Sequence, residues 1–178
     1  MTWDERKIAT AIGRHVLDRK CVVLVDNCSW TGYECDILGV TTDLRIIDVE
    51  AKISRADLKA DARKDKWWQT YFRDPATGAY HRCERRPREW PVKVWKHYYA
   101  MPAEIWDDKL FASLASTKSG VILLAEQGSS RLPCATVKRR ATPDKDAYRL
   151  QPAEVMDIAR LANLRMWSAY EQLAQRTT

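Results

Sequence analysis

The segment YECDILGVTTDLRIIDVEAK, residues 33 to 52, decides the fold class of this chain. Two largely apolar stretches, residues 33–40 and 44–51, flank a short Thr-Thr-Asp connection, an arrangement typical of a β-hairpin. At the end of this segment Asp48, Glu50 and Lys52 alternate with apolar residues. Because successive side chains of a strand point to opposite faces, we expect these three charged groups to share one face.

Helices and further strands are expected on both sides of this hairpin. Thr2 and Glu5 form a capping box that predicts an amphipathic helix over residues 3–19. The remaining pattern predicts a strand at 21–25, a charged helix from 54 to about 71, a loop or inserted hairpin over 72–91, a strand at 92–100, a short helix at 103–115, strands at 120–125 and 135–140, and a last helix from 152 to about 174. This order predicts an α/β fold with a mixed β-sheet flanked by helices.

Length and composition favour one globular domain over residues 1–178. The chain has 46% hydrophobic and 30% charged residues, which suits a single hydrophobic core. No apolar run is long enough to span a bilayer, and the N-terminus lacks the apolar stretch of a signal peptide, so a cytoplasmic protein without a membrane partner is expected. The five cysteines show neither zinc-ligand nor disulfide spacing and are expected to be reduced.

A second carboxylate, Asp36, precedes the charged strand in the same hairpin. A hairpin of this length places Asp36 across from the Glu50 region. Two carboxylates suit a hard cation such as Mg²⁺, which lowers the pKa of a bound water, and the ammonium group of Lys52 would orient that water. These residues therefore predict phosphodiester hydrolysis. The alternative is an exposed face of an edge strand that carries solvated ion pairs.

The same residues resemble the PD-(D/E)XK, or restriction-endonuclease-like, nuclease superfamily. The resemblance rests on Asp36 followed by Glu50-Ala51-Lys52, on the run EAKISRADL at 50–58, and on KHYYAMP at 96–102. It is strongest with the small phage and bacterial members of the MmcB-like group, which are linked to DNA repair. It implies an αβββαβ core, to which this chain adds a basic insertion at about 73–91 and a C-terminal helix.

The resemblance also implies roles for individual residues. Asp36, Glu50 and the Ala51 carbonyl are expected to hold Mg²⁺, with Mn²⁺ as an expected substitute, and Lys52 is expected to position the attacking water. Glu5 matches an acidic position on the first helix of many members, although its capping box explains it equally well. Gln69 is the best additional candidate, on the second helix.

Three further acids have competing explanations. Asp48 shares the face of Glu50, and it either assists the metal or pairs with Arg45 or Lys59. Asp57 and Asp61 have sufficient roles in capping and in ion pairs within the second helix.

Most of the net charge of +6 lies between Tyr80 and Lys96. Phosphates are the natural partner of such a segment, and its tryptophans suit base stacking. A solvated basic loop with tryptophans packed beneath it is the alternative. The expected nucleic-acid-binding residues are Arg82, Arg85, Arg86, Arg88, Trp90 and Lys93.

The sequence therefore predicts a Mg²⁺-dependent deoxyribonuclease with DNA as its partner. Two-fold pairing suits duplex cleavage, so a homodimer is one expected assembly. One alternative is a non-catalytic DNA- or protein-binding accessory module, such as a phage or anti-defence factor, on the same fold. Another is a structural partner in a repair complex that uses a tryptophan-rich contact surface formed by Trp3, Trp67, Trp68 and Trp106.

Overall fold

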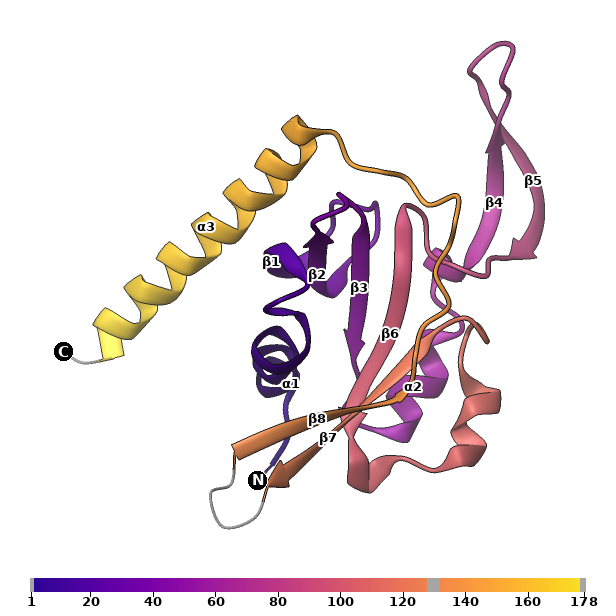
Figure 1. Cartoon of the computed structure of the whole chain (residues 1–178). Coiled ribbons are helices and arrows are strands. Elements are labelled where there is room, and N and C mark those ends of the chain that lie inside the picture. The colour runs from indigo at the N-terminus through magenta and orange to yellow at the C-terminus, as the bar shows by residue number, and fades with distance from the viewer. Residues whose placement is uncertain (1, 128–131, 177–178) are drawn as a thin grey trace.

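A six-stranded mixed β-sheet forms the centre of the computed structural model, which describes residues 2–127 and 132–176 (Figure 1). The strands lie in the order β1-β2-β3-β6-β7-β8. Antiparallel pairing joins β1 (Cys21–Cys28), β2 (Cys35–Thr41) and β3 (Ile46–Ala51). Parallel pairing then joins β3 to β6 (Val94–Pro102) and β6 to β7 (Gly120–Gln127), and β8 (Leu132–Arg139) closes the sheet antiparallel to β7. The expected α/β fold with a mixed sheet is confirmed.

The first helix is shorter than predicted and has a different cap. α1 (Glu5–Ile12) begins after Asp4, whose carboxylate accepts a hydrogen bond from the Lys7 amide at 2.8 Å, so the predicted Thr2 cap is wrong. A π-helical stretch, Gly13–Leu17, continues the chain. The apolar face of α1 packs against the side chains of Ile37, Ile47 and Val49.

The last helix, α3 (Pro152–Arg176), agrees with the prediction and covers the other face of the sheet near β1. Its buried Ile158 joins a second core cluster with Leu38 and Val40, whose side chains alternate with that of Ile37 along β2. The sheet is thus covered on both faces.

The second helix ends well before the predicted residue 71. α2 (Arg55–Asp61) begins as predicted, with the Ser54 hydroxyl accepting a hydrogen bond from the Asp57 amide at 3.1 Å. A 3₁₀ turn, Asp65–Trp67, then leads into β4 (Trp68–Arg73). Aromatic and β-branched residues favour strands, and in this segment that preference and strand pairing outweigh the charged helical pattern.

The insertion between α2 and β6 is a separate two-stranded sheet. β4 pairs antiparallel with β5 (Tyr80–Pro87), so the hairpin prediction is confirmed, with an earlier start than residue 72. At its turn Asp74 accepts hydrogen bonds from the Ala76 amide at 2.8 Å and the Thr77 hydroxyl at 2.7 Å. The hairpin projects away from the six-stranded sheet (Figure 1).

Between β6 and β7 the chain forms two 3₁₀ segments, Ala103–Ile105 and Asp108–Ser113, in place of the predicted helix over 103–115. Leu110 from this region packs with Trp67 and Tyr99 in a third core cluster. The other tryptophans of the expected contact surface, Trp3, Trp68 and Trp106, are partly buried against core clusters. They therefore act mainly in packing, and the tryptophan-rich contact surface does not form.

Two expectations from composition can be compared with the structure. All five cysteines are free thiols, as expected. Within residues 2–127 and 132–176, no helix has the length and apolar character needed to cross a membrane.

Candidate functional site

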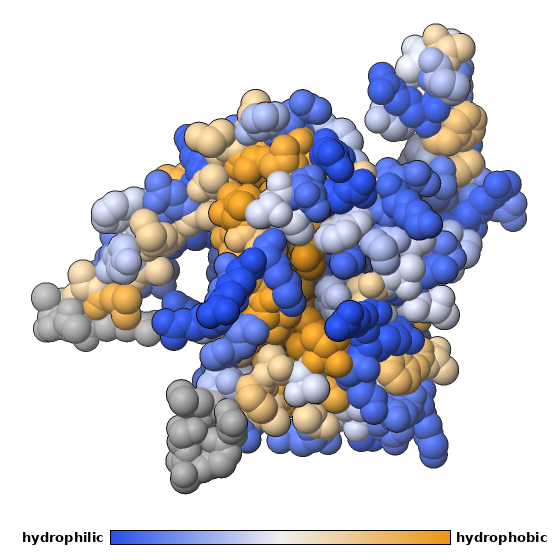
Figure 2. Space-filling view, viewed as in Figure 1, coloured by the Kyte–Doolittle hydropathy of each residue, from blue (hydrophilic) through white to orange (hydrophobic). Residues whose placement is uncertain are grey.

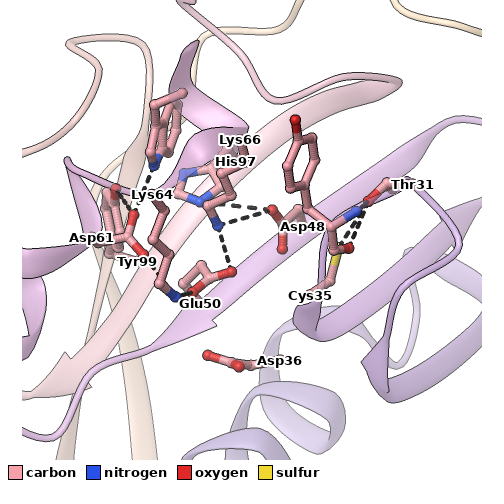
Figure 3. A network of polar contacts seen from close by, with 12 residues as sticks. Thr31, Cys35, Asp36, Asp48, Glu50, Asp61, Lys64, Lys66, His97 and Tyr99 are labelled. Carbon is pink, nitrogen blue, oxygen red and sulfur yellow. Dashed lines mark hydrogen bonds and ion pairs between the residues drawn. The ribbon is translucent and has the colours of Figure 1, made fainter.

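The charged side chains of β3 meet lysines from the segment that follows α2. Glu50 is fully buried, with 0% of its surface exposed. Its Oε2 accepts hydrogen bonds from Lys52 Nζ at 2.9 Å and Lys64 Nζ at 3.2 Å, and its Oε1 accepts one from Lys66 Nζ. Figure 3 shows Lys64 and Lys66 converging on this carboxylate. Because β3 is a central strand and these groups are buried, the exposed edge-strand alternative is wrong.

Asp61, at the end of α2, completes the cluster. Its Oδ1 lies 3.2 Å from Lys52 Nζ and 3.1 Å from Lys64 Nζ. Its Oδ2 accepts hydrogen bonds from the Trp67 indole at 2.8 Å and the Tyr99 hydroxyl at 2.6 Å. Asp61 of α2 is thus bonded to Lys52 directly after β3, to Trp67 of the 3₁₀ turn and to Tyr99 of β6. This role extends well beyond the predicted ion pair within its own helix.

The early end of α2 explains why Lys64 and Lys66 reach Glu50. In a helix continued to residue 71, two positions that lie two residues apart would point in widely different directions. The chain instead leaves the helix after Asp61 and turns through Asp65–Trp67, which brings both ammonium groups to one side. The sequence prediction missed both lysines for this reason.

These contacts fix the charge state of the cluster. Burial alone would raise the pKa of Glu50, but Lys66 and Lys52 outweigh it and lower that pKa to about 2. The same lysines hold the pKa of Asp61 below its usual range in spite of burial. Conversely, the acids outweigh burial at Lys52 and raise its pKa, with Glu50 as the largest contributor and Asp61 next. Glu50, Asp61 and Lys52 are therefore all ionised at neutral pH.

Asp36 has a different environment from Glu50. The β2–β3 register pairs Ile37 with Val49, which places Asp36 beside Glu50, and Asp36 Oδ2 accepts a hydrogen bond from the Ala51 amide at 2.8 Å. In the part of the chain that the structure describes, no lysine or arginine forms an ion pair with it, and Figure 3 shows it apart from the bonded network. Burial and then the charge of Glu50 raise the pKa of Asp36 to about 6.

Asp48 lies deeper in the same face. Its Oδ2 is 3.7 Å from Lys66 Nζ and 3.8 Å from His97 Nε2, so the predicted pairing with Arg45 or Lys59 is wrong. Burial is the main reason that the pKa of Asp48 rises to about 7, and burial likewise lowers the pKa of His97 to about 3. His97 is therefore neutral, and its Nδ1 shares a hydrogen bond of 2.9 Å with the Ser119 hydroxyl.

Asp36 also lines a pocket of about 360 Å³. Glu5 of α1 lines the same pocket, as do two cationic side chains, Arg6 and Arg165. Because Asp4 is the cap of α1, capping no longer explains Glu5. Gln69, in contrast, lies in the hairpin, where its side chain donates a hydrogen bond to the Tyr71 carbonyl, and it is not part of the cluster.

The expected nucleic-acid-binding residues divide into two groups. Arg82, Arg85 and Arg86 are exposed on β5. The other members, Arg88, Trp90 and Lys93, are partly buried. The Trp90 indole donates a hydrogen bond to the Thr142 carbonyl at 2.9 Å, and the Lys93 ammonium lies 4.3 Å from the centroid of the Trp30 ring. Trp90 and Lys93 thus have contacts within the protein, whereas Arg88 Nε is buried without a hydrogen-bond partner among the described residues. The exposed basic surface is on the hairpin.

The donor atoms of Asp36 and Glu50 fit a hard cation, but they are not equally free. The raised pKa of Asp36 reflects repulsion by Glu50 after burial, and a cation between the two carboxylates would relieve it. Both oxygens of Glu50 already accept hydrogen bonds from lysines, so one ammonium group must leave first. Lys64, with 50% of its side chain exposed, is the best suited to do so. Among the described residues, no group of three or more His, Cys, Asp and Glu side chains is arranged to hold a metal ion.

Comparison with known proteins adds evidence on the fold alone. No family model matches the chain, and no curated protein matches it. Among solved structures, SPO1766, a protein of unknown function from Silicibacter pomeroyi, is similar with a TM-score of 0.57. The two sequences are 18% identical, and the match covers 98% of this chain and 94% of that chain. The arrangement of helices and strands described above is therefore shared over nearly the whole length.

Proposed function

We propose that this chain is a divalent-metal-dependent deoxyribonuclease of the PD-(D/E)XK type. The observation that carries the proposal is the meeting of Asp36, Glu50 and Lys52 on adjacent strands, with Asp36 lacking an ion-pair partner among the described residues. The element order α1-β1-β2-β3-α2-β6 agrees with the αβββαβ core that the sequence resemblance implies. The resemblance and the geometry thus support the same reaction class.

Asp36, Glu50 and the Ala51 carbonyl are the groups that would hold Mg²⁺ or Mn²⁺. When bound, the cation would lower the pKa of a water molecule and neutralise charge on a phosphate oxygen. Glu50 is ready for this role because it is ionised, with a pKa of about 2. Asp36 becomes fully ionised only above its raised pKa of about 6, so cation binding is expected to strengthen between pH 5 and 7.

Lys52 acts as a hydrogen-bond donor and a positive charge in this proposal. Glu50 and Asp61 raise its pKa, so the ammonium group stays protonated at neutral pH. A permanently protonated lysine cannot accept a proton from water, but it can orient water and stabilise negative charge that develops on phosphate. We therefore assign Lys52 an orienting role and not that of a general base.

Cationic side chains near the acids support DNA as the substrate. Arg6 and Arg165 line the pocket that contains Asp36, and further arginines lie on the hairpin. Guanidinium groups bind phosphates through paired hydrogen bonds. Glu50 does not line this pocket, and Arg165 already lies 3.7 Å from Asp26 Oδ1 and donates a hydrogen bond to the Asn27 carbonyl. The pocket thus places Arg6, which suits a phosphate, near Asp36.

One observation favours the second candidate, a non-catalytic DNA- or protein-binding module. The three lysines already satisfy both oxygens of Glu50 and neutralise its charge without a metal. A buried ion cluster of this kind can be purely structural. The two candidates differ in whether a divalent cation enters the cluster.

The test compares DNA cleavage by the wild type, Asp36→Asn and the matched control Asp43→Asn, which changes an exposed carboxylate in the β2–β3 turn. Labelled single-stranded and duplex DNA are incubated with Mg²⁺, Mn²⁺ or EDTA. We expect metal-dependent cleavage by the wild type and the control, and a loss of more than about 100-fold in Asp36→Asn, since even indirect partners of metal ligands contribute about 10- to 100-fold. DNA binding without cleavage under every condition would support the non-catalytic module.

A further inference from the structure

One face of the β4–β5 hairpin combines two tyrosines with two arginines. The register pairs Tyr71 with Arg82 and Arg73 with Tyr80. Cross-strand partners share a face, and residues two apart on a strand share a face, so these four side chains lie together. We call this surface the Tyr-Arg face. The strand register is irregular between Gln69 and Tyr71, and the exposed acid Glu84 follows Arg82 by two residues, so the face is limited to these four side chains.

The Tyr-Arg face is open to solvent. Tyr71 is 55% exposed and Tyr80 is 74% exposed, and both arginines are exposed. Within the described residues, Arg82 forms no ion pair, and the hairpin stands clear of the body of the molecule (Figure 2). Large aromatic side chains at this exposure gain free energy when a flat partner covers them.

The opposite face of the hairpin has contacts within the protein. Phe72 and His81 stack there with ring centroids 5.5 Å apart, and the Arg85 guanidinium lies 4.2 Å from the centroid of the Trp68 ring. The acidic group at the tip, Asp74, accepts hydrogen bonds in the turn. Phe72 remains 46% exposed, but its ring is already paired with that of His81. Among the described residues no ring or cation–π contact involves Tyr71 or Tyr80, so the Tyr-Arg face is the one with open ring surfaces.

Alternating rings and guanidinium groups match the chemistry of an unpaired nucleic-acid strand. Bases in a single strand expose their flat faces, on which tyrosine rings can stack, whereas bases in a duplex already stack on each other. The arginines would contact phosphates between the stacked bases. An acidic protein partner would use the arginines but would not require open ring faces.

We propose that the Tyr-Arg face binds a single-stranded segment of DNA. The choice of DNA rests on the proposed nuclease function, which this inference deepens by naming a substrate with an unpaired strand. Binding at this face needs neither metal nor cleavage, so the two claims can fail separately.

The experiment measures DNA binding in EDTA by fluorescence anisotropy, with a labelled single strand and a duplex of the same sequence. Tyr71→Ala and Tyr80→Ala are compared with Tyr170→Ala, a tyrosine on α3 that is also 55% exposed. We expect each hairpin variant to weaken single-strand binding about tenfold, while duplex affinity and the control change less than about twofold. Tyr71→Phe should retain affinity because it keeps the ring, and Arg82→Gln should lower the slope of log K against log salt by about 0.7 for the single strand.

Circular dichroism and thermal unfolding establish that each variant is folded. The double variant Tyr71→Ala/Tyr80→Ala is measured in the same way. Equal losses on single strand and duplex, unchanged single-strand binding in the double variant, or no binding of nucleic acid by the wild type would overturn the proposal. Single-strand binding through the Tyr-Arg face without cleavage in any metal would uphold it and refute the nuclease function. Cleavage of a single strand by the wild type, with unchanged binding in the double variant, would support the nuclease function and overturn the proposal for the Tyr-Arg face.

Discussion

Asp36 differs from the other acids of the cluster because no lysine neutralises it in the described structure. Glu50 and Asp61 each contact two or more ammonium groups, whereas Asp36 has the Ala51 amide as its hydrogen-bond donor. Its carboxylate is therefore costly to keep ionised in the folded protein. At the scale of single residues, this cost is what a bound cation would remove.

Asp36→Asn should therefore stabilise the metal-free protein at pH 8. A carboxyl whose folded pKa is raised from 3.8 to about 6 destabilises the fold above that pKa, and the cost disappears as the pH falls towards 3.8. We expect a gain on the order of 1 kcal/mol in the free energy of unfolding at pH 8, smaller at pH 4.5, from urea titrations in EDTA. A loss of stability at pH 8 would show that the ionised carboxylate is a structural group.

Lys64→Gln should strengthen the binding of Mn²⁺. Lys64 is the exposed ammonium beside Glu50 Oε2 and Asp61 Oδ1. Its removal leaves Lys52 on both oxygens but opens one acceptor position on Glu50 Oε2 and removes one competing positive charge. We expect about tenfold tighter binding by calorimetry, in line with the loss of one competing charge near the protein surface. Lys59→Gln, which changes an exposed lysine on α2, is the matched control. Unchanged or weaker binding in Lys64→Gln would contradict competition between Lys64 and the cation.

At the scale of elements, α2 positions the cluster although it is only Arg55–Asp61. Its first turn depends on the Ser54 cap, and its last residue, Asp61, contacts both Lys52 and Lys64. A short helix relies on such end contacts because few internal hydrogen bonds support it.

Ser54→Ala should lower the free energy of unfolding by about 1 kcal/mol through loss of that cap. The matched control is Thr2→Ala, because the sequence pattern predicts a cap at Thr2 but the structure uses Asp4. We expect thermal and urea unfolding to leave Thr2→Ala unchanged. A destabilised Thr2→Ala with an unaffected Ser54→Ala would contradict the described helix starts.

The sequence was sufficient to predict those elements that depend on residues close together in the chain. The hairpin of β2 and β3, the shared face of Asp48, Glu50 and Lys52, and the approach of Asp36 follow from two-residue alternation and a short turn. Lys64 and Lys66 could not be predicted, because the charged residues after Ser54 continue a helical pattern into β4. Pairing with β5 decides where that helix stops, and strand pairing is not a local property.

At the scale of the whole molecule, α1 and α3 cover opposite faces of one sheet, and the hairpin extends beyond it.

The homodimer stays a prediction at this scale. α3 exposes several large apolar side chains, among them Met156, Leu164 and Trp167, and helix faces of this kind often bind a partner. We expect sedimentation equilibrium to give twice the mass of one chain and Trp167→Ser to lower it; a single-chain mass for the wild type would contradict the homodimer.

Metal-dependent DNA cleavage by the wild type and Lys52→Met tests the central claim most directly. The account predicts that the wild type cleaves DNA with Mg²⁺ or Mn²⁺ but not with EDTA, and that Lys52→Met binds DNA equally well yet does not cleave it. Full cleavage by Lys52→Met would contradict the assignment of Asp36, Glu50 and Lys52 as an active site. So would a wild type that binds DNA and cleaves none with either metal.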